Sequence, residues 1–291
     1  MKAFVTGAGG QLGHDVMEEL TRRGHEAVGS DLLPPALPLD ITDGAAVQRI
    51  IGQVRPDVVI HCAAWTAVDA AEEPENREKV FAINEGGTRH MAEACRQVNA
   101  KLIYISTDYV FDGQGERPWQ PEDPADAPLN VYGQSKRAGE RAVEELLERC
   151  FIVRIAWAFG QNGRNFVKTM LSVGRAYDTV RVVNDQFGTP TYTRDLARLL
   201  ADMAETEKYG RYHVTNTGGY ISWYEFTREI YRQAGMETHV IPVTTEEYGL
   251  SRAARPRNSR LDQEKLRRMG FEPLPPWQDA LGRYLKEMQK E

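Results

Sequence analysis

The sequence contains few cysteines and no concentration of basic residues. Its 291 residues include three cysteines, Cys62, Cys95 and Cys150, which lie far apart and form no CxxC pair. Isolated cysteines of this kind are typical of reduced thiols and argue against a disulfide framework or a zinc site. The formal net charge is -6. Because nucleic acids are bound by clustered Lys and Arg, we expect no nucleic acid partner.

Long hydrophobic runs are also absent. No apolar stretch approaches the roughly 18 residues that a membrane-spanning helix requires. Residues 1–6 enter a strand pattern directly and lack the charged and apolar segments of a signal peptide. We therefore expect no membrane partner and a cytoplasmic location. Hydrophobic residues make up 41% of the chain and charged residues 27%, which is ordinary for a globular protein.

Residues 1–155 alternate short apolar runs with helical patterns. The runs predict strands at residues 3–6, 27–29, 57–62, 102–106 and 151–155. The periodicity between them predicts helices at residues 12–23, 47–54, 80–98 and 131–149. Strands that are each returned by a helix imply right-handed crossovers and a parallel sheet, and unbroken apolar strands imply a sheet covered on both faces. We therefore predict an α/β fold, a Rossmann-type parallel sheet with helices on both faces.

The second half of the chain is less regular. Helices are predicted at residues 165–174 and 195–203, and strands at residues 180–183 and 211–215. We expect a dinucleotide-binding domain over residues 1–158 and, over residues 159–291, mainly a smaller C-terminal substrate-binding lobe. Part of residues 190–217 is expected to return to the first domain.

A glycine-rich loop follows the first predicted strand. Gly7, Gly10 and Gly13 have the spacing GxxGxxG and open the first predicted helix. Backbone that approaches closely at a helix N-terminus can bind the pyrophosphate of a dinucleotide, and side chains at these glycines would block that contact. Asp31 follows the second predicted strand, where a carboxylate can accept a hydrogen bond from the adenine ribose and disfavours a 2′-phosphate. The alternative is a turn that binds nothing, and the choice between NADPH and NADH stays open.

Three residues have the chemistry of a ketone reductase. Tyr132 and Lys136 are spaced i, i+4 on a predicted helix, and Thr107 follows the predicted strand at residues 102–106. A tyrosine can give a proton to a ketone oxygen if its pKa falls from about 10, and a nearby ammonium favours the phenolate. The Thr107 hydroxyl can hydrogen-bond the same oxygen. We predict all three as catalytic, with Tyr132 and Lys136 also contacting the cofactor; the alternative is a packing tyrosine, a solvated lysine and a capping threonine.

The GxxGxxG loop, the threonine after the central strand and the YxxxK pair together resemble the extended short-chain dehydrogenase/reductase family. Longer stretches narrow the resemblance to its dTDP-4-dehydrorhamnose reductase branch, over nearly the whole chain. They are HCAAWTAVDAAE (His61–Glu72), YISTDYVFDG (Tyr104–Gly113), VYGQSKRAGE (Val131–Glu140), VRIAWAFG (Val153–Gly160) and VNDQFGTPTYTRDLA (Val183–Ala197). The resemblance implies reduction of the 4-keto group of dTDP-4-dehydro-L-rhamnose to dTDP-L-rhamnose by NADPH or NADH.

The resemblance also implies further site residues. Those expected to contact the cofactor, besides the glycines and Asp31, are Gln11, Leu12, Asp40, Ile41, Ala63, Ala64, Thr66 and Asn84. Those expected to contact the dTDP-sugar are Val68, Thr107, Asp108, Trp157 and, at its diphosphate, Arg257. Some relatives bind magnesium through acidic residues at a dimer interface, but the stretch TYTRD after Pro190 supplies no such set. We therefore predict no metal site, although magnesium stays possible, and a monomer or homodimer.

Two other functions stay open at this point. One is a related nucleotide-sugar reductase or an epimerase, which would return the hydride to the same cofactor. The other is a non-catalytic nucleotide-binding regulatory subunit, which would have no chemical need for the Thr107, Tyr132 and Lys136 set.

Overall fold

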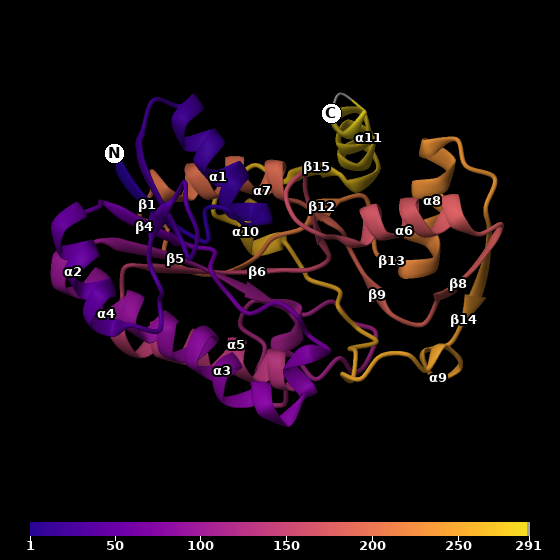
Figure 1. The fold of residues 1–291 in the computed structure, drawn as a ribbon, viewed down its shortest axis with the longest axis horizontal. Coiled ribbons are helices and arrows are strands. Elements are labelled where there is room, and N and C mark those ends of the chain that lie inside the picture. The colour runs from indigo at the N-terminus through magenta and orange to yellow at the C-terminus, as the bar shows by residue number, and fades with distance from the viewer. Residues whose placement is uncertain (290–291) are drawn as a thin grey trace.

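A parallel sheet organises the first half of the chain. The computed structural model describes residues 1–289, and within them seven strands pair in the order β11-β6-β5-β4-β1-β2-β3 (Figure 1). These strands are β1 (Lys2–Thr6), β2 (Glu26–Asp31), β3 (Leu37–Pro38), β4 (Val58–His61), β5 (Lys101–Thr107), β6 (Cys150–Ile155) and β11 (Gly210–His213). Their pairings are parallel throughout. The chain leaves β1 toward β2 on one side and resumes at β4 on the other, which creates a topological switch point, where such folds bind ligands.

Helices cover both faces of this sheet, as Figure 1 shows. One face carries α1 (Gln11–Arg22), α7 (Thr193–Ala204) and α10 (Glu264–Arg268), and the other α2 (Gly44–Val54), α4 (Thr88–Val98) and α5 (Val131–Leu146). Neighbouring residues of β1 pack on opposite faces of the sheet: Val5 lies in the core under α1 and Phe4 in the core under α2. This two-sided burial explains the unbroken apolar strands and confirms the predicted fold class.

The helix predicted at residues 80–98 is wrong in one respect. The structure divides it into α3 (Arg77–Phe81), a π turn η3 (Ala82–Gly87) and α4. The π turn contains Asn84, whose side-chain amide binds both the backbone N–H and the carbonyl of Trp65. Such turns are rare and often lie at functional sites. No pattern in the local sequence predicts one, because it depends on a partner elsewhere in the chain.

A smaller lobe follows β6 and lies beside the sheet, on the right of Figure 1. Its core lies between α6 (Phe166–Ala176), α8 (Trp223–Ala234), α11 (Trp277–Met288), β8 (Thr179–Val183) and β14 (His239–Val243). Short two-stranded pairs also form after β6: β7 (Ala158–Phe159) with β10 (Thr191–Tyr192), β9 (Phe187–Gly188) with β13 (Ile221–Ser222), and β12 (Asn216–Thr217) with β15 (Leu274–Pro276). The remaining short helices are the 3-10 helices η1 (Ala70–Glu72), η2 (Pro74–Asn76) and η4 (Asp108–Val110) and the α-helix α9 (Thr245–Tyr248).

The chain crosses back to the sheet after entering the lobe, because β11 pairs with β6. The division predicted between residues 158 and 159 stays a prediction, and residues 290 and 291 of the predicted lobe lie outside the described part. Within residues 1–289, no helix is both long enough and apolar enough to span a bilayer.

Candidate active site

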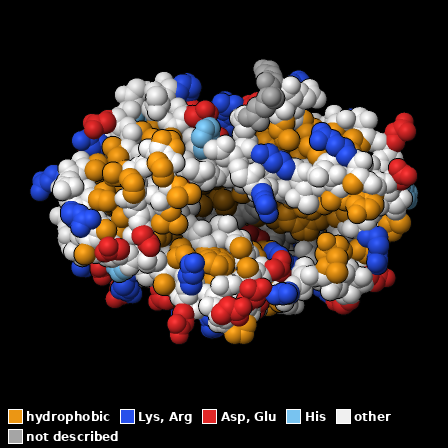
Figure 2. Space-filling view, in the orientation of Figure 1, with side chains coloured by type: hydrophobic (Ala, Val, Ile, Leu, Met, Phe, Trp, Pro, Cys, Tyr) orange, Lys and Arg blue, Asp and Glu red, His pale blue; other side chains and the backbone are white. Residues whose placement is uncertain are grey.

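A cavity of about 640 Å³ runs along the carboxyl ends of the central strands. Figure 2 shows the surface hollowed between the sheet and the lobe, with hydrophobic side chains along the opening. The volume is in the usual range for small-molecule sites. The sequence-predicted residues that line it are Gly7, Gly10, Gln11, Leu12, Asp31, Asp40, Ile41, Ala63, Ala64, Thr66, Thr107, Asp108, Tyr132, Lys136 and Trp157. The fold therefore brings the two predicted groups, cofactor and catalytic, into one cavity.

The glycine loop gives one end of the cavity the character of an anion site. Gly10 is the N-cap of α1, no side chain caps its free N–H groups, and the first turn carries no acidic residue. The loop closes tightly: a Cβ on Gly13 would lie 2.0 Å from the Gly7 carbonyl oxygen. Free N–H groups and the helix dipole favour negative charge here, so the loop fits the pyrophosphate of a dinucleotide.

Asp31 lies beside this loop. Its Oδ2 accepts a hydrogen bond from the Gly9 N–H at 2.9 Å, and its Oδ1 accepts one from the Leu32 N–H at 2.7 Å. Both oxygens are thus fixed by backbone, which holds the carboxylate at the cavity wall. The two arginines at the end of α1 are engaged elsewhere, since Arg22 pairs with Glu19 and Arg23 with Glu19 and Asp202.

The start of α5 determines where Tyr132, the predicted proton donor, lies. Asn130 caps the helix by accepting from the Gly133 N–H at 2.8 Å, so Tyr132 falls in the first turn. A Cβ on Gly133 would lie 2.2 Å from the Tyr109 carbonyl oxygen, so glycine lets the helix approach η4 closely. The Tyr132 ring meets the edge of Tyr109, with centroids 5.6 Å apart, and its hydroxyl hydrogen-bonds Thr107. Tyr132 therefore faces the cavity next to Thr107.

The expected lowering of the Tyr132 pKa is wrong for this structure. Burial raises the pKa of Tyr132 above its ordinary value, against a smaller lowering by the hydrogen bond with Thr107. The Lys136 ammonium instead donates to the Ile105 carbonyl at 2.7 Å. The phenol therefore keeps its proton at neutral pH, which is the form a proton donor must have, but burial also makes it a weaker acid than an exposed tyrosine.

Lys136 is almost fully buried, with 3% of its surface exposed. Burial lowers the pKa of Lys136 to about 7, while the charge of Glu140 raises it. The ammonium lies 4.1 Å from the centroid of the Tyr104 ring, and such contacts stabilise a desolvated cation. The Lys136 side chain therefore changes between its charged and its neutral form near neutral pH.

The Asp108 carboxyl group is buried but only partly hydrogen-bonded. It is 3% exposed, and its Oδ1 accepts a hydrogen bond from the Thr107 hydroxyl at 3.0 Å. Within residues 1–289, its Oδ2 has no well-formed hydrogen bond. Burial raises the pKa of Asp108 to about 6, although Ser259, Thr107 and Arg255 lower it. An unpartnered buried acceptor at the cavity wall can bind a ligand hydroxyl.

Trp157 lines the cavity in a strained conformation. Its φ of 50° lies in the left-handed region, which is rare for a residue with a large side chain. The ring stacks on Trp223, with centroids 3.6 Å apart and planes 15° from parallel. Strain of this kind persists where surrounding contacts hold it, often at functional sites. The stacked pair gives this part of the cavity an aromatic wall.

Four predicted residues lie outside the cavity lining: Gly13, Asn84, Val68 and Arg257. Gly13 packs against Gly7, and Asn84 is buried, with its amide donating to Ser135 at 2.9 Å. Arg257 pairs with Glu246 and lies 3.9 Å from Asp185. Their contacts with ligands stay predictions.

The cavity also has residues that sequence reasoning missed. They include Thr6, Ser30, Leu32, Leu39, Cys62, Ile83, Ile105, Ser106, Ile155, Ala156, Ala158, Gly163, Arg164 and Thr193. Several directly adjoin predicted residues at strand ends, so the carboxyl-end rule could have found them. Gly163, Arg164 and Thr193 carry no local signal, because they reach the cavity only when the chain after β6 has folded back toward α1.

One group of side chains on α1 has the spacing of metal ligands, but an arginine already pairs with one of its carboxylates. His14, Asp15 and Glu18 on α1 have ligand atoms within 4.8 Å of one another. The Arg194 guanidinium, however, donates to Glu18 at 3.2 Å and to Glu287 at 2.7 Å. Because this cation already occupies the neighbourhood, we assign no metal to these residues.

The sheet, the glycine loop and the cluster of Thr107, Tyr132 and Lys136 define a nicotinamide-dependent oxidoreductase of the short-chain dehydrogenase/reductase class. The chain belongs to the family described as RmlD substrate binding domain, whose model matches residues 1–290. The predicted family is thereby confirmed.

Named relatives agree with this family. A dTDP-4-dehydrorhamnose reductase from Streptomyces griseus is 46% identical over 287 residues, which cover 96% of this chain and 91% of the relative. A dTDP-4-keto-6-deoxy-D-glucose reductase from Streptomyces niveus is 37% identical over 280 residues, which cover 96% of this chain and 94% of the relative. The crystal structure of a Bacillus anthracis dTDP-4-dehydrorhamnose reductase in complex with NADP has a TM-score of 0.92 and 43% identity, covering 99% of this chain and 100% of that chain.

Proposed function

We propose that this protein reduces the 4-keto group of dTDP-4-dehydro-L-rhamnose to dTDP-L-rhamnose, using NADPH or NADH. The observation that carries the proposal is the meeting of Thr107, Tyr132 and Lys136 in the cavity that also contains the glycine loop. The names of the relatives supply the substrate class, and the fit of the α1 N-terminus to a pyrophosphate supplies the cofactor class.

The proposed chemistry divides between cofactor and protein. A bound reduced nicotinamide dinucleotide would supply the hydride to the ketone carbon. Tyr132, whose phenol is protonated at neutral pH, donates this proton to the ketone oxygen. Thr107 holds that oxygen by a hydrogen bond once its hydroxyl proton turns from Asp108 to the ketone, and the Lys136 ammonium stabilises the phenolate that remains.

The sugar is proposed to bind between Asp108 and Trp157, both of which line the cavity. The unpartnered Oδ2 of Asp108 can accept a hydrogen bond from a sugar hydroxyl, and the Trp157 ring offers an apolar face to the 6-deoxy carbon. Val68 and Arg257 complete the predicted substrate contacts, with Arg257 directed to the diphosphate once it leaves Glu246.

Turnover with the 4-keto sugar nucleotide tests this function. Purified protein mixed with NADPH or NADH and dTDP-4-dehydro-L-rhamnose should consume the reduced nicotinamide. The loss of its absorbance measures the rate. Tyr132→Phe should lower kcat by at least ~100-fold, the scale of losing a general acid, while nucleotide affinity measured by fluorescence changes little. Wild-type turnover in this variant would refute the role of Tyr132, and no turnover by the unaltered protein would refute the function.

A second candidate is reduction of a differently configured dTDP-4-keto-6-deoxy sugar. The Streptomyces niveus relative, named for such an activity, favours it. Assaying both keto sugars side by side separates the two by their kcat/KM ratio. An epimerase would retain its nicotinamide without net consumption, and a regulatory subunit would turn over neither sugar.

We infer that the enzyme works in the cytoplasm, and that it is a monomer or a homodimer. The free thiols of Cys62, Cys95 and Cys150 support a reducing compartment. Size-exclusion chromatography with light scattering distinguishes the two oligomeric states.

A further inference from the structure

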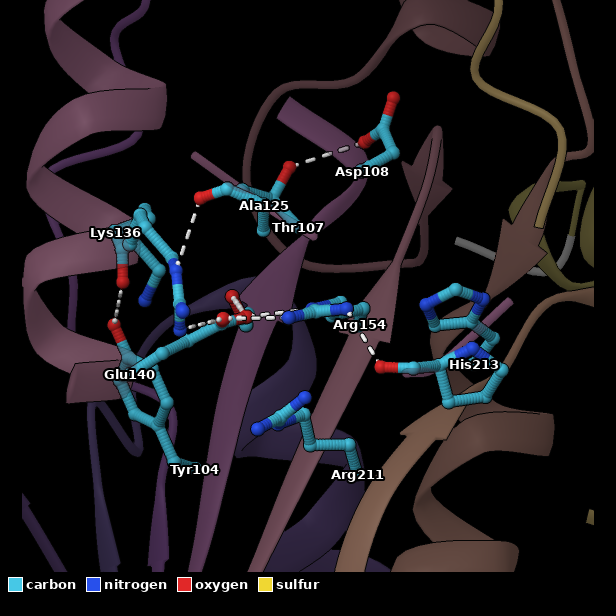
Figure 3. Close-up of polar contacts among 12 residues, drawn as sticks. Tyr104, Thr107, Asp108, Ala125, Lys136, Glu140, Arg154, Arg211 and His213 are labelled. Atoms are coloured by element: carbon cyan, nitrogen blue, oxygen red, sulfur yellow. Dashed lines mark hydrogen bonds and ion pairs between the residues drawn. The ribbon is translucent and has the colours of Figure 1, made fainter. Parts of the chain in front are cut away.

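A buried ion pair lies behind the catalytic helix. Glu140 and Arg154 are each 0% exposed. Arg154 donates to Glu140 twice, from Nε to Oε1 and from Nη2 to Oε2, each at 2.8 Å. Figure 3 shows the two side chains pointing toward one another between α5 and β6. Taking two charges out of water is costly, and apolar residues of similar volume often stabilise a fold equally well, so the pair calls for another explanation.

Glu140 joins the two chain segments that carry the proposed catalytic residues. Its Oε1 accepts a hydrogen bond from the Ser106 hydroxyl at 2.6 Å, and Ser106 directly precedes Thr107 on β5. On α5, Tyr132, Lys136 and Glu140 follow at i, i+4 spacing and share one face of the helix. The carboxylate therefore fixes the turn after Lys136 to the strand end that carries Thr107.

Glu140 also supplies the negative charge near the Lys136 ammonium. The other groups facing Lys136 are the Tyr104 ring on β5, and His61 and Cys62 at the end of β4. Burial lowers the pKa of His61 to about 3 and raises the pKa of Cys62 to about 12, so both are neutral at pH 7. Burial also raises the pKa of Tyr104, which keeps that phenol neutral.

The Glu140 carboxylate stays ionised in this surrounding. Burial raises its pKa, but the hydrogen bonds and charge of Arg154, the hydrogen bond from Ser106 and the charge of Arg137 together outweigh burial, and the net pKa is lowered. Arg137 adds a hydrogen bond to Oε2 at 3.0 Å. Arg154 is held in turn by the Pro121 carbonyl at 3.1 Å. A permanent carboxylate is thus available to the lysine one turn away.

We propose that Glu140 is a positioning residue for the reaction, which keeps the Lys136 side chain cationic in the cavity and holds Thr107 in register with Tyr132. Arg154 makes this possible by keeping Glu140 charged inside the protein. The inference rests on the proposed reductase function, in which a protonated lysine supports turnover.

The double variant Glu140→Leu/Arg154→Met tests the proposal without leaving one buried charge unpaired. Losing the carboxylate should remove the charge that opposes burial, so that Lys136 gives up its proton at lower pH. The alkaline limb of kcat/KM should move down by about one pH unit, which corresponds to ~10-fold lower kcat/KM at pH 8 with little change at pH 6. Thermal unfolding should stay close to that of the unaltered protein.

A direct readout does not depend on activity. With 13C-labelled lysine, NMR titration of the whole chain reports the protonation of Lys136, identified by the signal that disappears in Lys136→Arg. The midpoint should fall in the double variant. Glu144→Gln is the matched control: Glu144 lies one turn further along α5, accepts from Arg137 and Arg211, and is partly exposed. It should leave the pH profile and the titration unchanged.

The outcomes distinguish a failure of the role inferred for Glu140 from a failure of the proposed reductase function. If the double variant folds and its pH profile and lysine titration coincide with those of the unaltered protein, Glu140 is only a structural residue and the inference fails. If the unaltered protein reduces no keto sugar, the proposed function fails, and the lysine titration still decides whether Glu140 controls Lys136.

Discussion

The proposed cofactor end and the proposed substrate end of the cavity are built in different ways. At the cofactor end, β1, the glycine loop and α1 are consecutive in the chain, and their contacts are local: the Gly10 N–H donates to the Gly7 carbonyl at 2.9 Å. At the substrate end, Trp157 is stacked on Trp223, and Arg255 reaches the Tyr109 hydroxyl at 2.9 Å. Such residues are brought together only by the lobe. A site made of consecutive residues shows in the sequence, whereas a site made of distant ones does not.

The connecting segment before α10 illustrates the second kind of construction. Isolated bridges pair Trp119 with Leu261 and Phe187 with Asn258. Asp69 accepts from the backbone N–H of Ala253 at 3.0 Å. These contacts fasten one late segment to three earlier parts of the chain. The substrate end therefore depends on the lobe and the sheet being folded against each other.

The largest expected effect is on the cofactor end. Gly13→Ala would bring a Cβ to 2.0 Å from the Gly7 carbonyl oxygen, which is backbone and cannot rotate away. We expect a loss of about 3 kcal/mol in the free energy of unfolding, together with weaker NADH binding, measured by thermal unfolding and fluorescence titration. Gly52→Ala on α2 is the control, because a Cβ there meets nothing within 4 Å and alanine favours the helix. If both variants behaved alike, close packing of the loop would not matter.

An effect of at most the same size, which appears only at higher pH, is expected at the proposed substrate end, through the pH dependence of stability. The folded protein holds the Asp108 proton more tightly than the unfolded chain, since burial raises its pKa to about 6. Its contribution to stability is therefore complete below about pH 4 and lost as the pH rises through 6. Asp108→Asn, which stays neutral, should be more stable than the unaltered protein by up to about 3 kcal/mol at pH 8 and no more stable at pH 4.

Thermal unfolding of both proteins between pH 4 and pH 8 measures this difference. Asp126→Asn serves as the control, because Asp126 is exposed (70%) and pairs with Arg141 only at 3.6 Å. Two curves that stay parallel across the range would show that the Asp108 carboxyl is not held protonated by the fold.

The smallest expected effect concerns the choice of cofactor. Asp31 presents a fixed carboxylate at the cavity wall, and the cations among the described lining residues are Lys136 and Arg164. We expect NADH to be preferred over NADPH, and Asp31→Ser to raise the kcat/KM for NADPH relative to NADH by ~10-fold, because the repulsion of a 2′-phosphate is removed.

Steady-state kinetics with both cofactors measures that ratio. Asp43→Ser is the matched control: Asp43 caps α2 through the Ala46 N–H, a role that serine keeps, and it does not line the cavity. A clear preference of the unaltered protein for NADPH would contradict the role given to Asp31.

The sequence by itself was enough to predict the sheet, the glycine loop and the set of Thr107, Tyr132 and Lys136, which the fold brings into one cavity. Strand and helix patterns, and residue types at fixed spacing, follow from local conformational preference and alternating burial, so they can be recognised without knowing the fold. The predicted strands at residues 102–106 and 151–155 correspond closely to β5 and β6.

Only the tertiary structure decided the state of those residues. It revealed the π turn at Asn84, the raised pKa of Tyr132 and the buried carboxylate of Glu140 beside Lys136. These properties depend on desolvation and on charges that arrive from other elements, and both quantities are fixed only when the chain has closed around the site.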